Sequence, residues 1–293
     1  MSRSSLVAAL SVAVLAATVV AVPSLAQSPA ASPGPSPSAA PATSPVASPA
    51  PAAVQPVAGR ASASCKAFES ASAQTVAVDI AQGYAATVRL CSNPTTGFRW
   101  SDPVSADPTI ATVSGWTFEA PSKPIPGAPG VEALTVNGLA VGHTQVTASY
   151  DQPWDGGTKG AWTVTIEVTV RPAVTVAIDC AAFDASNKAT AAVTAPVGST
   201  VVLTVCSNAS TGYTWRKPVS SEPAIAVPGA FVDQQVPAPT GDNPPIVGAP
   251  GAQVLSIAAD ASGTAVVSAK YQRPWEKKQA KSAWTFQLTV TVE

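Results

Sequence analysis

A period of two dominates the pattern of hydrophobic and polar residues from about residue 60 to the end of the chain. The segments TVTIEVTV at 163–170 and FQLTVTV at 286–292 place an apolar residue at every second position. Such alternation is typical of β-strands that bury one face. Similar runs at 76–80, 85–91, 131–136 and 145–150 are separated by clusters of Gly, Pro, Asn and Asp, with no amphipathic helix between them. Short strands at this spacing predict an all-β fold of antiparallel β-sandwiches.

The strand pattern is duplicated. The segment CSNPTTGFRW at 91–100 recurs as CSNASTGYTW at 206–215, 115 residues later, and GAPG at 127–130 recurs at 248–251, 121 residues later. The second copy therefore has six additional residues, in a Pro-rich stretch where an insertion lengthens a surface loop. Because each copy has a length typical of one domain, we predict tandem domains at 60–172 and 173–293, with the boundary near Arg171 and Pro172.

The N-terminal segment has the order of a secretory signal peptide, predicted over 1–26. Arg3 precedes an apolar stretch from Leu6 to Val22, and the small-residue site Ser24-Leu25-Ala26 follows. An uncleaved membrane anchor is the alternative, because the apolar stretch approaches spanning length. Residues 27–59 are mostly Pro, Ala and Ser and predict a disordered linker, either a spacer from a wall or membrane or an extension without function. The predicted location is secreted or extracytoplasmic.

The four cysteines fit one disulfide in each domain. Cys65 and Cys91 are separated by 26 residues, and so are Cys180 and Cys206. In an exported chain this spacing predicts the pairs Cys65–Cys91 and Cys180–Cys206, each worth roughly 3 kcal/mol in the chain-entropy picture. Four free thiols are the alternative. A metal site is not predicted, because the sequence has no CxxC spacing and only one histidine.

The charge pattern does not predict a nucleic-acid partner. Only 11% of the residues are charged, and the formal net charge is −1. The densest basic cluster, Lys277, Lys278 and Lys281, is more typical of a solvated loop than of a surface that neutralises successive phosphates.

The sequence also argues against an enzyme. The single histidine, His143, lies in a turn that the second copy fills with Ser262-Gly263. Carboxylates are not repeated either, because Gln272 occupies the place of Asp151 in the second copy. No acid–base pair recurs, so neither catalysis nor a cofactor is predicted.

Three loop motifs do recur, in the same order in both copies. In the first copy they are Asn93, Pro94, Thr95, Thr96, Gly97 and Phe98; Gly127, Ala128, Pro129 and Gly130; and Gln152, Pro153 and Trp154. In the second they are Asn208, Ala209, Ser210, Thr211, Gly212 and Tyr213; Gly248, Ala249, Pro250 and Gly251; and Arg273, Pro274 and Trp275. Together these motifs resemble the three signature loops of the chagasin-like inhibitors of papain-family cysteine peptidases.

The resemblance implies two immunoglobulin-like β-sandwiches whose three loops lie across the catalytic cleft of a papain-family peptidase, as in a secreted, reversible inhibitor. The residue types fit this role. Pro94 removes backbone freedom before binding, Thr95 and Thr96 are small, and Gly97 permits the positive φ that closes a turn. Trp154 would bury its indole against the cleft rim. The glycines of the second motif would allow close backbone approach.

Each copy departs from the family pattern once. Gln152 replaces an Arg that Arg273 retains, which predicts loss of a charged rim contact in the first domain. Ala209 replaces Pro94, which predicts a less preorganised loop in the second. A cell-surface adhesion or carbohydrate-binding module is the alternative function, and a structural stalk is a third. The remaining tryptophans in strand contexts are predicted to be core residues: Trp100, Trp162, Trp215 and Trp284.

Overall fold

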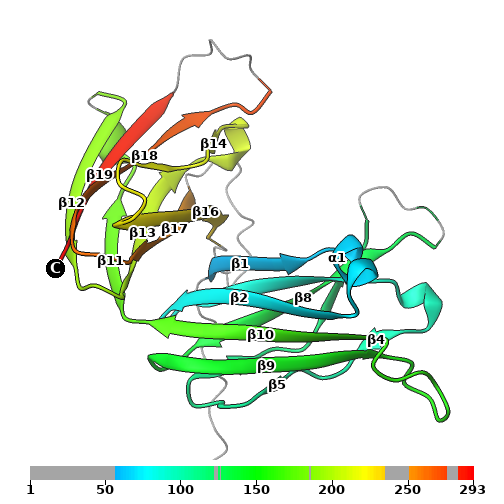
Figure 1. The fold of residues 1–293 in the computed structure, drawn as a ribbon. Coiled ribbons are helices and arrows are strands. Elements are labelled where there is room, and N and C mark those ends of the chain that lie inside the picture. Colours follow the sequence, from blue (N-terminus) through cyan, green and yellow to red (C-terminus); the bar gives the residue numbers. More distant parts are fainter. Residues whose placement is uncertain (1–56, 122–124, 126, 185, 235–250, 276–282) are drawn as a thin grey trace, which may run out of the picture. The chain divides into compact units, whose positions relative to one another are not determined.

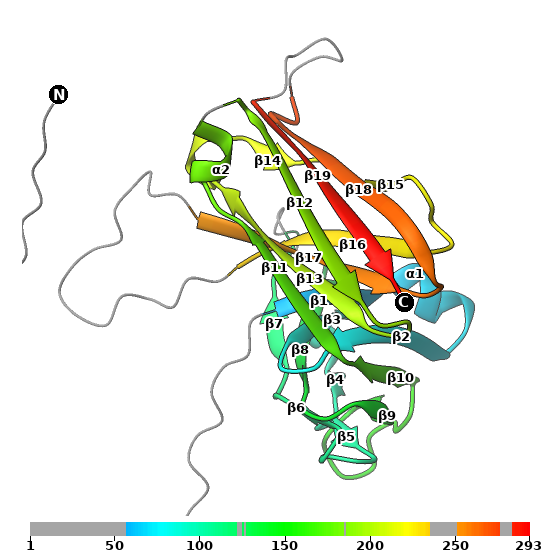
Figure 2. The same ribbon diagram turned by 90° about the vertical axis from the view of Figure 1, so that its left-hand side faces the viewer.

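The computed structural model describes residues 57–121, 125, 127–184, 186–234, 251–275 and 283–293 (Figures 1 and 2). The predicted signal peptide, most of the predicted linker and the Lys277, Lys278 and Lys281 cluster lie outside these residues. Within the described part of the chain, no helix is long and apolar enough to cross a membrane.

The first domain is a sandwich of two sheets. One sheet has the strand order β1 (Val57–Ala63), β3 (Ala85–Ser92), β8 (Gly130–Gly138) and β6 (Ala111–Val113), and β7 (Thr117–Glu119) also pairs with β8. The other has the order β2 (Ala73–Ala81), β10 (Trp162–Arg171), β9 (Gly142–Asp151) and β4 (Arg99–Trp100), with β5 (Val104–Ser105) also on β9.

The second domain repeats this arrangement. Its first sheet has the order β11 (Ala173–Ile178), β13 (Thr200–Ser207), β17 (Gly251–Ala259) and β16 (Ala226–Asp233). Its second has the order β12 (Lys188–Ala195), β19 (Trp284–Val292), β18 (Gly263–Gln272) and β14 (Thr214–Trp215), with β15 (Val219–Ser220) also on β18. The predicted pair of β-sandwich domains is confirmed.

The sheets are mixed rather than antiparallel throughout. The strand β1 runs parallel to β3, and β2 runs parallel to β10, as do the corresponding strands of the second domain. Because β1 and β2 follow each other along the chain but join opposite sheets, each pairs with a strand from elsewhere in the domain. Alternation of apolar residues identifies such a strand but carries no information on its direction.

Two short helices and the start of β1 were not predicted. The helix α1 (Cys65–Ser70) buries Phe68, and α2 (Ala181–Asp184) buries Phe183. The Ser64 side chain accepts a hydrogen bond from the N–H of Ala67, which is a cap signal that the sequence contained. The strand β1 begins at Val57, within the segment 27–59 predicted as linker, because pairing with β3 satisfies its backbone groups despite its composition.

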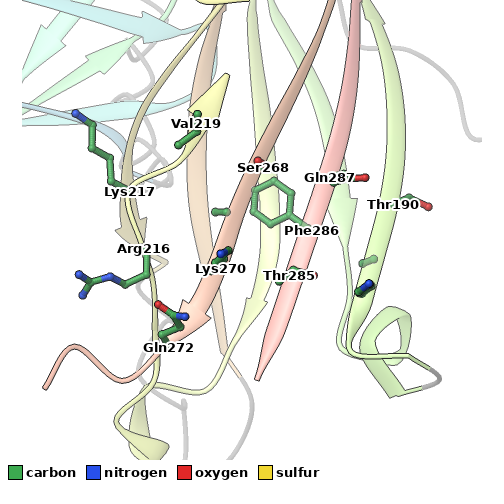
Figure 3. A pocket seen from close by; sticks show the side chains of 13 residues that line it. Thr190, Arg216, Lys217, Val219, Ser268, Lys270, Gln272, Thr285, Phe286 and Gln287 are labelled. Atoms are coloured by element: carbon green, nitrogen blue, oxygen red, sulfur yellow. The ribbon is translucent and has the colours of Figure 1, made fainter. Parts of the chain in front are cut away.

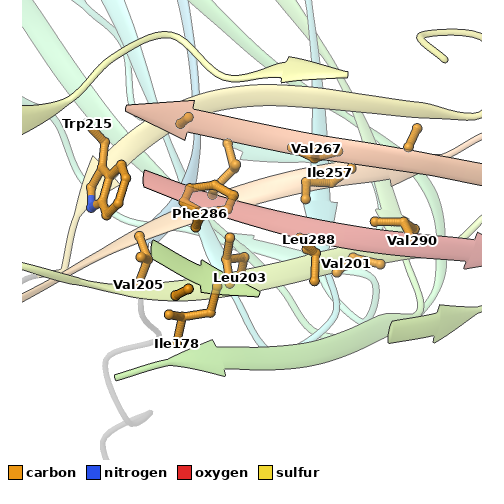
Figure 4. Close-up of a cluster of buried hydrophobic side chains, with 14 of the residues drawn as sticks. Ile178, Val201, Leu203, Val205, Trp215, Ile257, Val267, Phe286, Leu288 and Val290 are labelled. Atoms are coloured by element: carbon orange, nitrogen blue, oxygen red, sulfur yellow. The ribbon is translucent and has the colours of Figure 1, made fainter. Parts of the chain in front are cut away.

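The period of two separates an outward face from the core. On β18 and β19, Ser268, Lys270 and Gln287 face outward (Figure 3), whereas Val267, Phe286 and Leu288 lie in the core of the second domain (Figure 4). The four tryptophans predicted as core residues follow this division: Trp100 and Trp215 are buried, and Trp162 and Trp284 are partly buried against the core.

Both predicted disulfides are present. Cys65–Cys91 and Cys180–Cys206 each join the region of the short helix to the end of a central strand, and no described cysteine is free. Each bridge ends two residues before an Asn that opens the first loop motif, at Asn93 or Asn208. The disulfides therefore fix the base of that loop.

Candidate functional site

The first loop of the first domain, residues 93–98, is closed by its own hydrogen bonds. The hydroxyl of Thr95 donates to Asn93 Oδ1 at 2.6 Å, and the hydroxyl of Thr96 donates to the Asn93 carbonyl at 2.6 Å. A single 3₁₀ turn covers Pro94–Thr96 and ends at Gly97, whose φ of 82° favours glycine. The turn keeps its shape without a partner, while both threonines remain exposed.

A buried aromatic cluster supports this loop from below. The hydroxyl of Tyr150 accepts a hydrogen bond from the N–H of Asn93 at 2.7 Å, and Tyr150 itself is buried. The ring of Phe98 stacks on Tyr150 with 5.5 Å between centroids. Phe98, predicted as a binding residue, is half-buried and packs against the core. Its clearest role is to hold the loop in place.

Contacts between the loops join all three motifs of the first domain. The Asn93 side-chain N–H donates to the carbonyl of Gly127 at 2.9 Å, which links the first and second loops. The Trp154 ring lies so close to Gly97 that a Cβ at this glycine would be 2.6 Å from Cη2 of the indole. Trp154 is nevertheless 50% exposed. The three loops therefore form one surface where β3 and β9 end and β8 begins.

In the second loop of the first domain, glycine occupies positions 127 and 130 for two different structural reasons. Gly127 has a φ of 81° and open space around it. A Cβ at Gly130 would lie 2.6 Å from the Phe118 ring and 2.7 Å from the carbonyl oxygen of Glu119. Packing within the domain thus requires glycine at 130, whereas the sequence suggested close approach of a partner.

The third loop of the first domain is closed by Gln152. Its Oε1 accepts a hydrogen bond from the N–H of Thr158 at 3.0 Å, and its backbone carbonyl accepts one from Lys159 Nζ at 2.5 Å. Beside it, the side-chain hydroxyl of Ser149 and the N–H of Gly160 both donate to Asp151, and they lower the pKa of that carboxyl. Gln152 therefore stabilises the loop that presents Trp154.

The second domain builds its first loop in the same way despite Ala209. The hydroxyl of Ser210 donates to Asn208 Oδ1 at 2.6 Å, and that of Thr211 donates to the Asn208 carbonyl at 2.6 Å. The N–H of Asn208 donates to the Tyr271 hydroxyl at 2.7 Å. Tyr213 stacks on Tyr271 as Phe98 does on Tyr150. The turn that proline favours therefore also forms around Ala209.

Arg273 connects the third loop of the second domain to the first loop. Its Nε donates a long hydrogen bond of 3.4 Å to the carbonyl of Thr211, and its guanidinium carbon lies 4.6 Å from the centroid of the Tyr213 ring. The Trp275 ring packs against Gly212 and is 68% exposed. The predicted rim residue thus makes contacts within its own domain.

The second loop of this domain is described only at its end. Gly251 begins β17, where it pairs with Ser207. The predicted site residues Gly248, Ala249 and Pro250 lie outside the described residues.

The family profile of the chagasin family peptidase inhibitors (I42) matches residues 79–170 and 194–290, one match in each domain. The chain belongs to the chagasin family of peptidase inhibitors. Chagasin-family proteins are inhibitors and not enzymes, which agrees with the prediction from the unrepeated histidine and carboxylates. No curated protein sequence matches the chain.

Three of the solved structures that are similar to this chagasin-family chain match a length comparable with one of its domains. The cysteine protease inhibitor EhICP2 from Entamoeba histolytica is 23% identical, with 39% of this chain and 96% of that protein covered and a TM-score of 0.31. Amebosin is 23% identical, with 34% and 96% covered and a TM-score of 0.26. PbICP-C, solved in complex with falcipain-2, is 20% identical, with 34% and 89% covered and a TM-score of 0.29.

Glu132 lies beneath the loops of this chagasin-family chain and was not predicted as a site residue. It is 8% exposed, and the hydroxyl of the buried Ser92 donates to its Oε1 at 3.2 Å. Burial raises the pKa of Glu132, although the Ser92 hydrogen bond and the charge of Arg99 oppose this effect. The alternation of residues along this strand predicts that Glu132 is buried, because Glu132 is in phase with the buried Leu134 and Val136.

A cleft of about 380 Å³ lies under the first two loops of the first domain. Asn93, Thr96, Phe98 and Pro129 line it from the loops, and the Cys65–Cys91 disulfide and Trp162 line it from the domain body. It belongs to the loop surface. The single histidine lies elsewhere: His143 is near the start of β9, where its Nδ1 and the Thr169 hydroxyl are 3.0 Å apart.

Proposed function

We propose that the chain is a secreted, reversible inhibitor of papain-family cysteine peptidases and that each domain blocks the catalytic cleft of one peptidase with its three loops. The observation that carries this proposal is the joining of separate loops into one surface, through Asn93 with Gly127 and Gly97 with Trp154. Loops that are assembled before binding lose little conformational entropy on binding, so more of the contact energy contributes to affinity.

The first loop supports inhibition by occupation rather than by chemistry. The hydroxyl protons of Thr95 and Thr96 already bond to Asn93, so these groups can offer a partner only their remaining acceptor positions. Hydrogen-bond donors of the peptidase, such as its backbone N–H groups, are the matching partners. The exposed part of the loop carries no thiol, amine or carboxylate, and its threonine hydroxyls donate to Asn93, which cannot act as a base to activate them.

The exposed tryptophan supplies the large apolar contact. Trp154 and Trp275 each have one side against a glycine and the other available for burial in an interface. Aromatic residues in such positions contribute a large share of binding energy. One exposed tryptophan per loop set fits a cleft rim better than a carbohydrate platform, which would need several coplanar rings.

The proposal also includes export of the chain from the cytoplasm and the positions at which its two domains begin and end. Two disulfides are typical of an extracytoplasmic compartment, which supports a signal peptide over 1–26. A linker would then precede the inhibitor domains, with the first ending near Pro172 and the second occupying 173–293. The strands agree with this limit, because β10 ends at Arg171 and β11 begins at Ala173.

Titration of papain with the purified chain tests the proposal. We expect one chain to inactivate two papain molecules, and the double variant Trp154→Ala/Trp275→Ala to lose at least about 30-fold in affinity, the effect of removing an interface residue worth about 2 kcal/mol. The matched control is Val104→Ala/Val219→Ala, which truncates two side chains that are 62% and 63% exposed outside the loops.

The control should inhibit like the unmodified chain. Papain that stays active with excess chain would contradict the proposal, and an endpoint of one papain per chain would contradict two working domains. If the tryptophan variant inhibits normally but unfolds at a lower temperature, the tryptophans are structural and the loop assignment is wrong.

A further inference from the structure

A basic groove lies on the outer face of the second sheet of the second domain (Figure 3). It has a volume of about 460 Å³ and is lined by residues of β12, β18 and β19 and of the segment after β14. Among the described residues that line it, four are cations, Lys188, Arg216, Lys217 and Lys270, and none is acidic. All four are exposed, and none forms an ion pair with another described residue.

Strand register places three of these cations in one row across the sheet. Lys188 is opposite Thr285, and Thr285 is opposite Lys270 on the next strand. The N–H of Arg216 donates to the Lys270 carbonyl at 2.8 Å, which extends the row to the fourth strand. Neighbouring strands are about 4.8 Å apart, so Lys188 and Lys270 are separated by roughly two strand spacings, and Arg216 lies one spacing further.

A second row beside the first is neutral. It contains Thr190, Gln287 and Ser268 in register, followed by Val219 opposite Ser268. The groove therefore combines a line of positive charges with a line of hydroxyl and amide groups, and Lys217 adds a fourth charge at its edge.

This arrangement has an electrostatic cost that a ligand would remove. Like charges on neighbouring strands destabilise a sheet, and no described carboxylate offsets them here. A recessed surface of one charge sign also concentrates the field and attracts oppositely charged molecules. A ligand with several anionic groups would relieve the repulsion between the side chains of the cationic row.

The first domain provides an internal comparison. The same row there consists of Ala73, Thr163, Ser149 and Ser101, which are all neutral. Asp102 occupies the place of Lys217. The neighbouring row is neutral in both domains, with Thr75, Thr165, Thr147 and Val104 in the first. The two sheets thus share their framework and differ at the four charged positions, so the fold does not require the cations.

We propose that this groove binds one chain of an acidic polysaccharide, at a site separate from the peptidase-binding loops. Several cations in a row match repeated carboxylates along an extended polymer better than one small anion, and the neutral row can bond to sugar hydroxyls. A recessed site fits a single chain better than a flat membrane surface. Single-stranded nucleic acid would need exposed rings for base stacking, but Phe286, the only ring among the described residues that line the groove, is 1% exposed.

Calorimetric titration of the whole chain with octagalacturonate tests the proposal, with neutral maltooctaose, an oligo(dT) and phosphatidylserine vesicles as competing ligands. We expect binding of octagalacturonate that weakens at physiological salt of about 0.15 M, and no binding of maltooctaose. The variant Arg216→Ser/Lys270→Ser introduces the residues of the first domain and should reduce affinity by roughly tenfold or more. It should still inhibit papain, which separates this site from the loops.

The matched control is Arg60→Ala/Lys66→Ala, which removes the same charge from the first domain and should change affinity by less than about twofold. Equal losses in both variants would show attraction by net charge and overturn the proposal. Tighter binding of oligo(dT) or vesicles than of octagalacturonate, lost in the groove variant, would assign the groove to nucleic acid or membrane instead. Thermal unfolding confirms that both variants are folded, as expected for exposed positions.

Discussion

In their described residues, the two domains share the turn of the first loop and the exposed tryptophan of the third, but they support these loops with different side chains. Asn93 and Asn208 organise the first loop identically, although proline follows one and alanine the other. In the third loop, Gln152 bonds within its own loop, whereas Arg273 reaches across to Thr211 and Tyr213. The comparison shows that an asparagine and two hydroxyls define the shape of the first loop. Proline adds rigidity to a turn that forms without it.

The largest difference between the two domains is expected when a methyl group is added at the last glycine of the second loop. Gly130→Ala should destabilise the first domain by about 1 to 3 kcal/mol, because the Glu119 carbonyl cannot move away as a side chain can. Gly251→Ala is the matched control, since among the described atoms a Cβ there would have only the Ser207 carbonyl oxygen within 4 Å, at 3.8 Å. Denaturant unfolding of each full-length variant measures the difference, and equal destabilisation of the two domains would contradict the packing argument.

The contrast between Gln152 and Arg273 predicts a smaller effect. Arg273→Gln removes the contact with Tyr213 and should weaken inhibition by the second domain about two- to fivefold, because an exposed cation–π contact contributes roughly 0.5 to 1 kcal/mol. The measurement uses a chain in which Trp154→Ala has silenced the first domain.

The salt dependence of the inhibition rates distinguishes a contact of Arg273 within its own domain from a contact of Arg273 with the peptidase. If Arg273 acts within its domain, Arg273→Gln should mainly raise the dissociation rate. A variant that changes only the association rate, and only at low salt, would show that Arg273 faces the peptidase directly.

The smallest expected effect is a difference in pH response. Burial raises the folded-state pKa of Glu132 above its usual value of 4.5, so protonation favours the folded first domain. This contribution is fully present below pH 4.5 and is lost as the pH rises through the folded-state pKa. The second domain has Gln253 at this position, whose side chain does not titrate, so it lacks the effect.

Unfolding curves of the chain and of Glu132→Gln, measured from pH 4.5 to 8, test this difference. The variant should lose less stability than the unmodified chain over that range. Asp107 and Asp151 do not interfere, because their pKa values are lowered and their contributions disappear only as the pH falls below about 3.8. Identical curves would show that Glu132 titrates as an exposed carboxyl does.

Strand positions, the disulfide pairs and the division between core and exposed tryptophans were all predictable from the sequence. Each depends on local alternation or on spacing between duplicated residues. The roles of Gly130 and Arg273 were not predictable, because they depend on Phe118 and Thr211, which are distant in sequence and meet only in the fold. The parallel direction of the β1–β3 and β2–β10 pairs was not predictable for the same reason, because it depends on where the partner strand lies in the fold. Glu132 is different: its phase in the strand marked it as buried, and the prediction considered only whether it was repeated.

The 3₁₀ turn at Pro94–Thr96 has a consequence for the lifetime of the protein. Proteolysis of a folded chain requires local opening, so that the bond to be cut can leave its hydrogen bonds. Here the turn is closed by both threonine hydroxyls and by the Gly97 N–H, and its two ends are held by Tyr150 below Asn93 and by the buried Trp100. A segment held in this way is a poor substrate, so the loop proposed to enter a peptidase cleft is protected against cleavage there.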